Sequence, residues 1–185
     1  MEVRLHAVEF ASRANGPGLR AAVWFQGCTL GCPGCFNPDT HDVQSGYLTD
    51  TALLAEELLA RRSRIEGVTI SGGEPFRQPE ALLDLLWRLD GSGLSCLVFS
   101  GYSRCDLQLL RLGQAILRYV DVLIAGRYVA ARHLGHGLVG STNQRIHLLT
   151  RRYTLRDFDA VPRCEVILHA DGTISASGIQ PWRAA

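Results

Sequence analysis

Hydrophobic residues follow two different periods along most of the chain. Short runs rich in β-branched residues alternate with longer runs whose leucines repeat at helical spacing. The short runs predict strands at 2–8, 20–26, 67–71, 95–100 and 121–126. The longer runs predict helices at 51–62, capped by Asp50 or Thr51, at 79–89, and from Ser103 onward, where a capping box ends on Asp106.

This alternation predicts an α/β fold with an open parallel sheet and outer helices. A complete (β/α)₈ barrel needs roughly 250 residues, so the 185 residues of this chain predict a partial barrel in a single domain, 1–185. Residues 127–145 show neither period. The segments 164–170 and 173–177 predict a C-terminal β-hairpin with a two-residue turn at Asp171-Gly172, serving as an edge or cover for the sheet.

Composition narrows the class of protein. The formal net charge is +1, which gives no reason to expect nucleic acid or a membrane surface as the main partner. All 19 basic residues are arginine, which excludes mechanisms that need a lysine. No apolar run approaches the ~20 residues needed to span a bilayer, and the first ten residues lack a signal-peptide pattern. We therefore expect a cytoplasmic protein whose cysteines serve metal binding or catalysis.

The candidate chemistry lies in the segment FQGCTLGCPGCFNPDT, which places three cysteines at Cys28, Cys32 and Cys35. Sulfur ligands select zinc or an iron–sulfur cluster. His41 could complete a Cys₃His zinc site. Three further cysteines are scattered along the chain: Cys96, Cys105 and Cys164. We expect each to be a small buried residue, unless one of them completes an ordinary electron-carrying cluster. Alternatively, three thiolates hold a 4Fe–4S cluster and leave its fourth iron open.

The spacing C-x-x-x-C-x-x-C resembles that of the radical S-adenosylmethionine enzymes. TISGGEP (69–75) follows a predicted strand and resembles the GGE motif of that superfamily. Four further segments resemble the activases of two glycyl radical enzymes, anaerobic ribonucleotide reductase and pyruvate formate-lyase: NGPGLR (15–20), CPGCFN (32–37), FSGY (99–102) and GSTNQRIH (140–147). The resemblance covers roughly 8–147 and leaves 148–185 as an extension.

The resemblance implies a set of cofactor-binding residues. Cys28, Cys32 and Cys35 would hold one 4Fe–4S cluster, whose open iron chelates S-adenosylmethionine and whose electron releases a 5′-deoxyadenosyl radical. Gly34 and Phe36 would lie against S-adenosylmethionine, although core packing is an equal explanation for Phe36. The methionine end would be bound by the remaining motif residues, Gly72, Gly73 and Glu74.

The resemblance also implies a function: hydrogen abstraction from a glycine of a partner glycyl radical enzyme, with electrons from a flavodoxin or ferredoxin. A radical enzyme acting on a peptide or small metabolite is one alternative, and a non-catalytic zinc or iron–sulfur binding module is another. Ala125 stands where the ribonucleotide reductase activases tend to carry an acid. We expect a solvated loop at His133 and His136, partner contacts from Asn143 and Arg145, and a packing role for Trp182.

Overall fold

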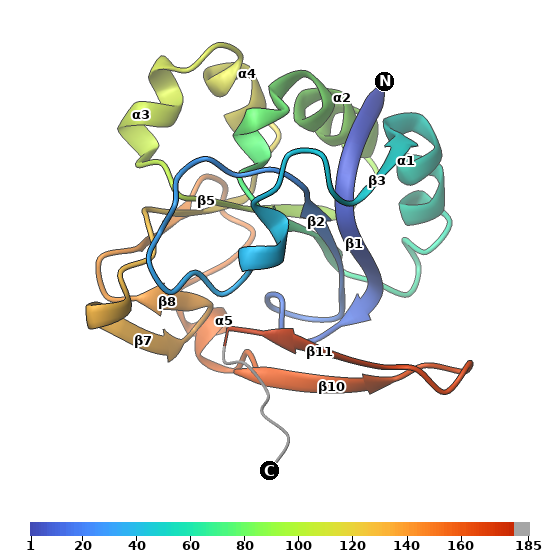
Figure 1. Cartoon of the computed structure of the whole chain (residues 1–185). Helices are drawn as coiled ribbons and strands as arrows, with labels where there is room; N and C mark the ends of the chain where they lie inside the picture. Colours follow the sequence, from blue (N-terminus) through green and yellow to red (C-terminus); the bar gives the residue numbers. More distant parts are fainter. Residues whose placement is uncertain (180–185) are drawn as a thin grey trace.

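The computed structural model describes residues 1–179 and centres on a seven-stranded sheet of order β3-β1-β2-β4-β5-β6-β9 (Figure 1). Four neighbouring strands are parallel: β2 (Arg20–Phe25), β4 (Gly67–Gly72), β5 (Ser95–Ser100) and β6 (Val122–Ala125). Three antiparallel strands flank them: β1 (Glu2–Ser12), β3 (Tyr47–Asp50) and β9 (Arg145–Leu148). The structure confirms the predicted α/β fold with an open parallel sheet, and it adds antiparallel strands at both edges of that sheet.

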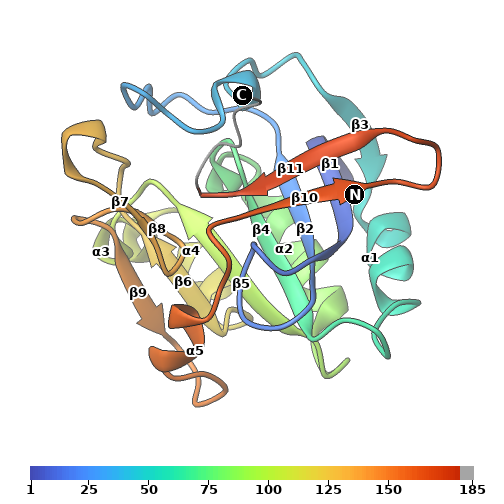
Figure 2. The same ribbon diagram turned by 90° about the horizontal axis from the view of Figure 1, so that it is seen from below.

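Helices cover one face of this sheet (Figures 1 and 2). They are α1 (Thr51–Leu59), α2 (Pro79–Leu89), α3 (Arg104–Leu109) and α4 (Gly113–Leu117). Leucines of α1 and α2 pack against alternate residues of the strands, and this layer holds the larger hydrophobic core. Asp50 caps α1 by accepting the Ala52 N–H at 2.7 Å, and the predicted capping box of α3 is present. The larger core therefore lies between the helices and one face of the sheet, and the site lies on the other face.

The opposite face is covered by the C-terminal part of the chain. A smaller core there joins Leu97, Val122 and Ile124 of the sheet to Phe158 of α5 (Arg156–Asp159). Two small hairpins complete this layer: β7 (His133–His136) with β8 (Val139–Ser141), and β10 (Cys164–Leu168) with β11 (Ile174–Gly178). In both views β10 and β11 lie across the open side of the sheet (Figures 1 and 2).

Arg20 ties these layers together at the start of the parallel strands. Its side chain is fully buried, and it donates to Thr69 Oγ1 at 2.9 Å, to Ser95 Oγ at 2.8 Å and to Tyr153 Oη at 3.0 Å. Backbone oxygens of Pro17, Val68 and Ser95 accept the remaining bonds. A buried cation needs all of its donors satisfied, so Tyr153 links the C-terminal layer to the base of the sheet.

Several local predictions differ from the structure. The helix predicted over 51–62 ends at Leu59. Beyond its end, Arg61 donates to the Glu57 carbonyl and lies over the Phe10 ring. Residues 127–145 contain a hairpin that carries no clear sequence period. The loop of the C-terminal hairpin is longer than two residues, because the last ladder bond runs from His169 N–H to Thr173 O. Within the loop Gly172, with φ of +85°, donates to the His169 carbonyl.

Trp182 lies outside the described residues. Among residues 1–179, no helix is long and apolar enough to cross a membrane.

Candidate functional site

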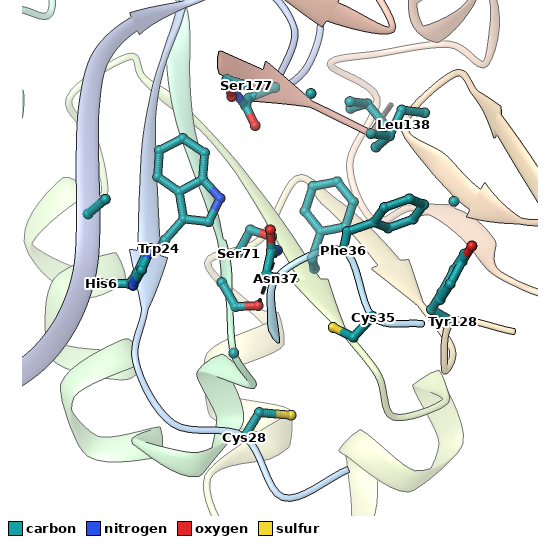
Figure 3. Close-up of a pocket in the computed structure, with 18 of the residues that line it drawn as sticks. His6, Trp24, Cys28, Cys35, Phe36, Asn37, Ser71, Tyr128, Leu138 and Ser177 are labelled. Atoms are coloured by element: carbon teal, nitrogen blue, oxygen red, sulfur yellow. Dashed lines mark hydrogen bonds between the residues drawn. The ribbon is translucent and has the colours of Figure 1, made fainter. Parts of the chain in front are cut away.

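A cavity of about 430 Å³ opens on the interior face of the sheet, where the parallel strands end (Figure 3). Ligands of open α/β sheets bind at this edge. Most of the residues singled out by sequence line it together: Cys28, Cys32, Cys35, Phe36, Gly72 and Gly73. Gly34 and Glu74 are not among the lining residues, and both contact other parts of the chain. The sequence motifs therefore converge on one cavity.

The cysteine loop is held at its two ends by backbone hydrogen bonds. Gly27 donates to Thr40 O at 2.8 Å, and Cys28 donates to His41 O at 3.1 Å. Between these points the loop carries three half-buried thiols. Burial raises the pKa of Cys28, although the N–H groups of Leu30 and Gly31 act in the opposite direction. Burial likewise raises the pKa of Cys35, opposed by the Asn37 N–H. The loop thus supplies both thiols and amides that stabilise charge on sulfur.

The donor set fits a cluster better than a single metal ion. Within residues 1–179, no three His, Cys, Asp or Glu side chains converge on one ion-sized position, as a zinc site requires. A cluster spreads its ligands over several irons, so its thiolates need not meet at a point. His41 contributes its carbonyl oxygen to the loop, and its Nε2 is buried without a hydrogen-bond partner in the described part of the chain. The Cys₃His hypothesis receives no support from this arrangement.

The three remaining cysteines lie away from the cavity lining. Cys96 is buried as predicted, and burial raises its pKa to about 12. Cys105 is exposed and Cys164 is partly exposed, so the prediction of small buried residues was wrong for Cys105. None of them is placed to complete a four-cysteine electron carrier with the loop.

Gly72 and Gly73 sit where β4 meets the start of the cysteine loop. Gly72 has φ of +103°, and an added Cβ would lie 2.4 Å from Phe25 O. A Cβ on Gly73 would lie 2.5 Å from Gly27 O. Real Cβ atoms do not approach backbone oxygens this closely, so only glycine fits at either position. The two glycines therefore bring the backbone of the motif against the loop that carries the thiols.

Glu74 is 1% exposed and does not line the cavity, although two of its hydrogen-bond partners, Ser100 and Gly101, do. Its carboxylate accepts the Gly101 N–H at 2.8 Å, the Phe76 N–H at 3.1 Å and the Ser100 hydroxyl at 3.0 Å. Burial raises its pKa to about 7, and these three donors oppose the shift. In this structure Glu74 acts as a tie between the ends of β4 and β5.

Aromatic residues form the side of the cavity next to the cysteines. The rings of Phe36 and Tyr128 have centroids 4.4 Å apart, and Phe36 lies 5.6 Å from the His133 ring. His133 Nδ1 is 3.2 Å from Tyr128 Oη. His133 and His136 are both exposed, as a solvated loop would have them, but they belong to strand β7. His133 also contacts the rings of Phe36 and Tyr128. Gly34 backs onto the same region, since a Cβ there would lie 3.3 Å from Ala130 Cβ.

The segment after β8 is used internally. Gln144 accepts the N–H groups of Gly140 and Ser141 and donates to Gly126 O at 2.9 Å. Asn143 donates to Arg127 O at 2.8 Å, while Arg145 is exposed. Asn143 is thus occupied within the chain, and only Arg145 of the two stays available for the partner contact predicted from sequence. Ala125 is buried at the end of β6, paired with Ser100 and Arg145.

Comparison with known proteins identifies the family of the chain. The chain matches the model of the 4Fe-4S single cluster domain over residues 14–147. It is 32% identical over 142 residues to the anaerobic ribonucleoside-triphosphate reductase-activating protein of Haemophilus influenzae, across 72% of this chain and 90% of that protein. The chain belongs to the glycyl-radical-enzyme activases of the radical S-adenosylmethionine superfamily.

Other relatives of this activase family match over different spans. The pyruvate formate-lyase-activating enzyme of Clostridium pasteurianum is 44% identical over 130 residues, which cover 65% of this chain and 50% of that enzyme. The chain thus spans half the length of one curated relative and nearly all of another. Among solved structures, QueE from Escherichia coli matches with a TM-score of 0.47 and 19% identity, over 56% of this chain and 54% of that chain.

The match to the 4Fe-4S single cluster domain ends at residue 147, before the C-terminal hairpin, yet the hairpin lines the cavity. The lining residues missed from sequence come from several elements: Asn15, Trp24, Asn37, Tyr128, Ser175 and Ser177. Asn37 lies two residues after Cys35, within the CPGCFN segment, and donates to Gly72 O at 3.4 Å, so its place in that motif was a usable signal. The serines of β11 lie more than 130 residues from the cysteines in sequence, and no local pattern relates the two.

Proposed function

We propose that the chain is a radical S-adenosylmethionine enzyme that generates a glycyl radical on a partner enzyme, such as an anaerobic ribonucleotide reductase. The observation that carries this proposal is the shared cavity, which brings three thiols, a glycine turn and an aromatic wall together where the parallel strands end. Membership of the activase family supports the same conclusion.

Each group of residues has a distinct task in this proposal. Cys28, Cys32 and Cys35 would hold one 4Fe–4S cluster, with amides of the loop stabilising its charge. The backbone of Gly72 and Gly73 would bind the methionine end of S-adenosylmethionine, and Phe36 with Tyr128 would pack on the rest of it. When bound, these cofactors supply one electron and a carbon–sulfur bond, whose reductive cleavage gives methionine and a 5′-deoxyadenosyl radical able to abstract hydrogen.

Glu74 and Gly34 support this site from outside the cavity. The Glu74 amide and carboxylate fix the glycine turn between the cysteine loop and β5. Gly34 lets the loop pack on Ala130. The protein thereby orients the cofactors and excludes water, while the cofactors carry the chemistry. A flavodoxin or ferredoxin is the proposed electron donor.

Anaerobic cleavage of S-adenosylmethionine tests the proposal. Protein reconstituted with iron and sulfide should release 5′-deoxyadenosine in the presence of dithionite, and Cys32→Ala should abolish the release. Cys105→Ala is the matched control, because Cys105 is exposed and lies away from the cavity. Tight binding of one zinc ion without uptake of iron would overturn the proposal in favour of a zinc-binding module.

A further inference from the structure

The hairpin beyond the family match presents an unpaired strand edge to the cavity. Strand β11 pairs with β10 and with no other strand of residues 1–179. His169 N–H donates to Thr173 O, which sets the alternation of the ladder. The pairs Ile167–Ser175 and Glu165–Ser177 therefore exchange backbone hydrogen bonds. The N–H and C=O groups of Ile174, Ala176 and Gly178 point to the free edge.

The part of that edge formed by Ala176 and Gly178 borders the cavity. The side chains of Ser175 and Ser177 lie on the inner face of the hairpin, where Ser177 Oγ is 2.5 Å from Asn15 Nδ2. Ala176 is exposed on the opposite face, as is Val166, its partner on β10. Ala176 and Gly178 nevertheless contribute to the cavity lining, whereas no β10 residue does. Their contribution therefore comes through the main chain.

The hairpin is anchored so that this edge keeps its position. The Glu165 carboxylate accepts the Arg13 N–H at 2.9 Å and the Ala14 N–H at 3.3 Å, and it also bonds the Ser12 hydroxyl. Ser177 projects into the cavity from β11 and Trp24 projects into it from β2 (Figure 3). The small residues of β11 leave room beside the indole for a chain that carries little side-chain bulk.

We propose that β11 binds the substrate by β-strand addition: an extended, glycine-containing segment of the partner protein pairs with its free edge. An unpaired edge offers alternating donors and acceptors that match a peptide backbone. A glycine in this segment fits between Ser177 and Trp24 because it adds no side chain. This inference rests on the proposed function and assigns its protein substrate to the C-terminal hairpin.

Peptide binding to the cluster-loaded protein tests this assignment. The probes are fluorescein-labelled eight-residue peptides with a central glycine, tiled across the glycyl radical enzyme of the same organism and followed by anisotropy. Ala176→Pro removes an N–H from the cavity edge, and Val166→Pro removes the matching N–H from the far edge of β10. Neither N–H belongs to the β10–β11 ladder, so β10 and β11 should remain paired in both variants.

We expect wild type to bind at least one peptide, Ala176→Pro to weaken its binding about tenfold, and Val166→Pro to stay within about twofold of wild type. Equal effects of the two prolines, or no binding by any peptide, would overturn the inference. A second measurement replaces single peptide amides with N-methyl amides. Pairing with β11 predicts losses at every second position, whereas a bound loop without strand pairing does not.

The two proposals fail separately. Wild type that cleaves S-adenosylmethionine and activates its partner, but whose peptide binding ignores Ala176→Pro, retains the proposed function and refutes strand addition. Wild type that binds a peptide through this edge but never cleaves S-adenosylmethionine retains the docking site and refutes the radical chemistry.

Discussion

The N–H of Glu74 donates a hydrogen bond of 3.0 Å to the carbonyl oxygen of Gly27. This bond joins the glycine turn at the end of β4 to the residue that precedes the first cysteine. Because Gly73 also donates to Phe25 O at 2.8 Å, the turn and the loop form one backbone unit. The two motifs that suggested the function are thus structurally inseparable.

Replacing Gly73 with alanine should separate them. The added Cβ would meet Gly27 O at 2.5 Å, so backbone must move at the start of the cysteine loop. Crowding of this kind costs about 1–3 kcal/mol. We expect a lower free energy of unfolding and reduced iron and sulfide content after reconstitution. Gly91→Ala, in open space, should cost about 1 kcal/mol from its positive φ and keep full cluster content. Equal cluster content in both variants would contradict the prediction.

The buried carboxyl of Glu74 predicts a pH-dependent stability. Its pKa in the folded chain is about 7, above its ordinary value of 4.5. Between these pH values the unfolded chain releases the proton and the folded chain keeps it, so stability falls as pH rises. Above about pH 7 both states are ionised and the effect levels off.

The measurement compares wild type with Glu74→Gln, which does not titrate. The free energy of unfolding of wild type relative to this variant should fall by on the order of 2 kcal/mol between pH 5 and pH 8. Denaturant titrations of the cluster-free protein at each pH measure this free energy of unfolding. Glu57→Gln, at an exposed position, is the control for the loss of one carboxylate. A constant difference between wild type and Glu74→Gln across this range would rule the assignment out.

Tyr153→Phe should weaken the attachment of the C-terminal layer. The lost hydroxyl leaves Arg20 Nη1 and Ser95 Oγ without one partner each, at 3.0 Å and 2.6 Å in the folded chain. We expect a loss of about 1–3 kcal/mol in the free energy of unfolding. Tyr119→Phe is the matched control, since the Tyr119 hydroxyl makes no hydrogen bond within residues 1–179. Identical urea midpoints for the two variants would count against a structural role for Tyr153.

Glu165→Ala should release the C-terminal hairpin without unfolding the sheet. Its carboxylate anchors β10 to the end of β1 and the two residues after it through three hydrogen bonds. Hydrogen exchange should become faster for amides of β10 and β11, while amides of β4 and β5 keep their protection. A uniform change across all strands would show that the hairpin and sheet unfold as one unit.

The sequence was informative where periodicity and motif coincide. α2 was predicted with its observed bounds, because Pro79 starts a helix and leucines repeat at helical spacing through Leu89. The capping box at Ser103 likewise marked a helix start that the structure confirms. The cysteines and the two glycines were recognisable because their spacing is itself the motif.

Other features depend on contacts that are distant in sequence. The antiparallel pairing of β9 with β6 brings Arg145 beside Ala125, and nothing in the polar segment before it predicts a strand. The role of Glu74 in binding S-adenosylmethionine stays a prediction, but no pattern in the sequence indicated its bonds to Ser100, at the end of β5, and to Gly101. Side-chain direction at a loop depends on tertiary partners that periodicity does not contain.

The C-terminal hairpin is a separate two-stranded sheet, joined to the larger sheet through side chains such as Glu165 and Asn15 rather than through a backbone ladder. Cluster-binding residues and the cavity wall therefore belong to segments that mutations can alter independently. If β11 binds its partner as proposed, exchanging 164–178 for a different hairpin changes the bound segment and leaves the cysteine loop and the sheet in place. Selectivity in such a protein can evolve, or be engineered, by replacing one short appendage.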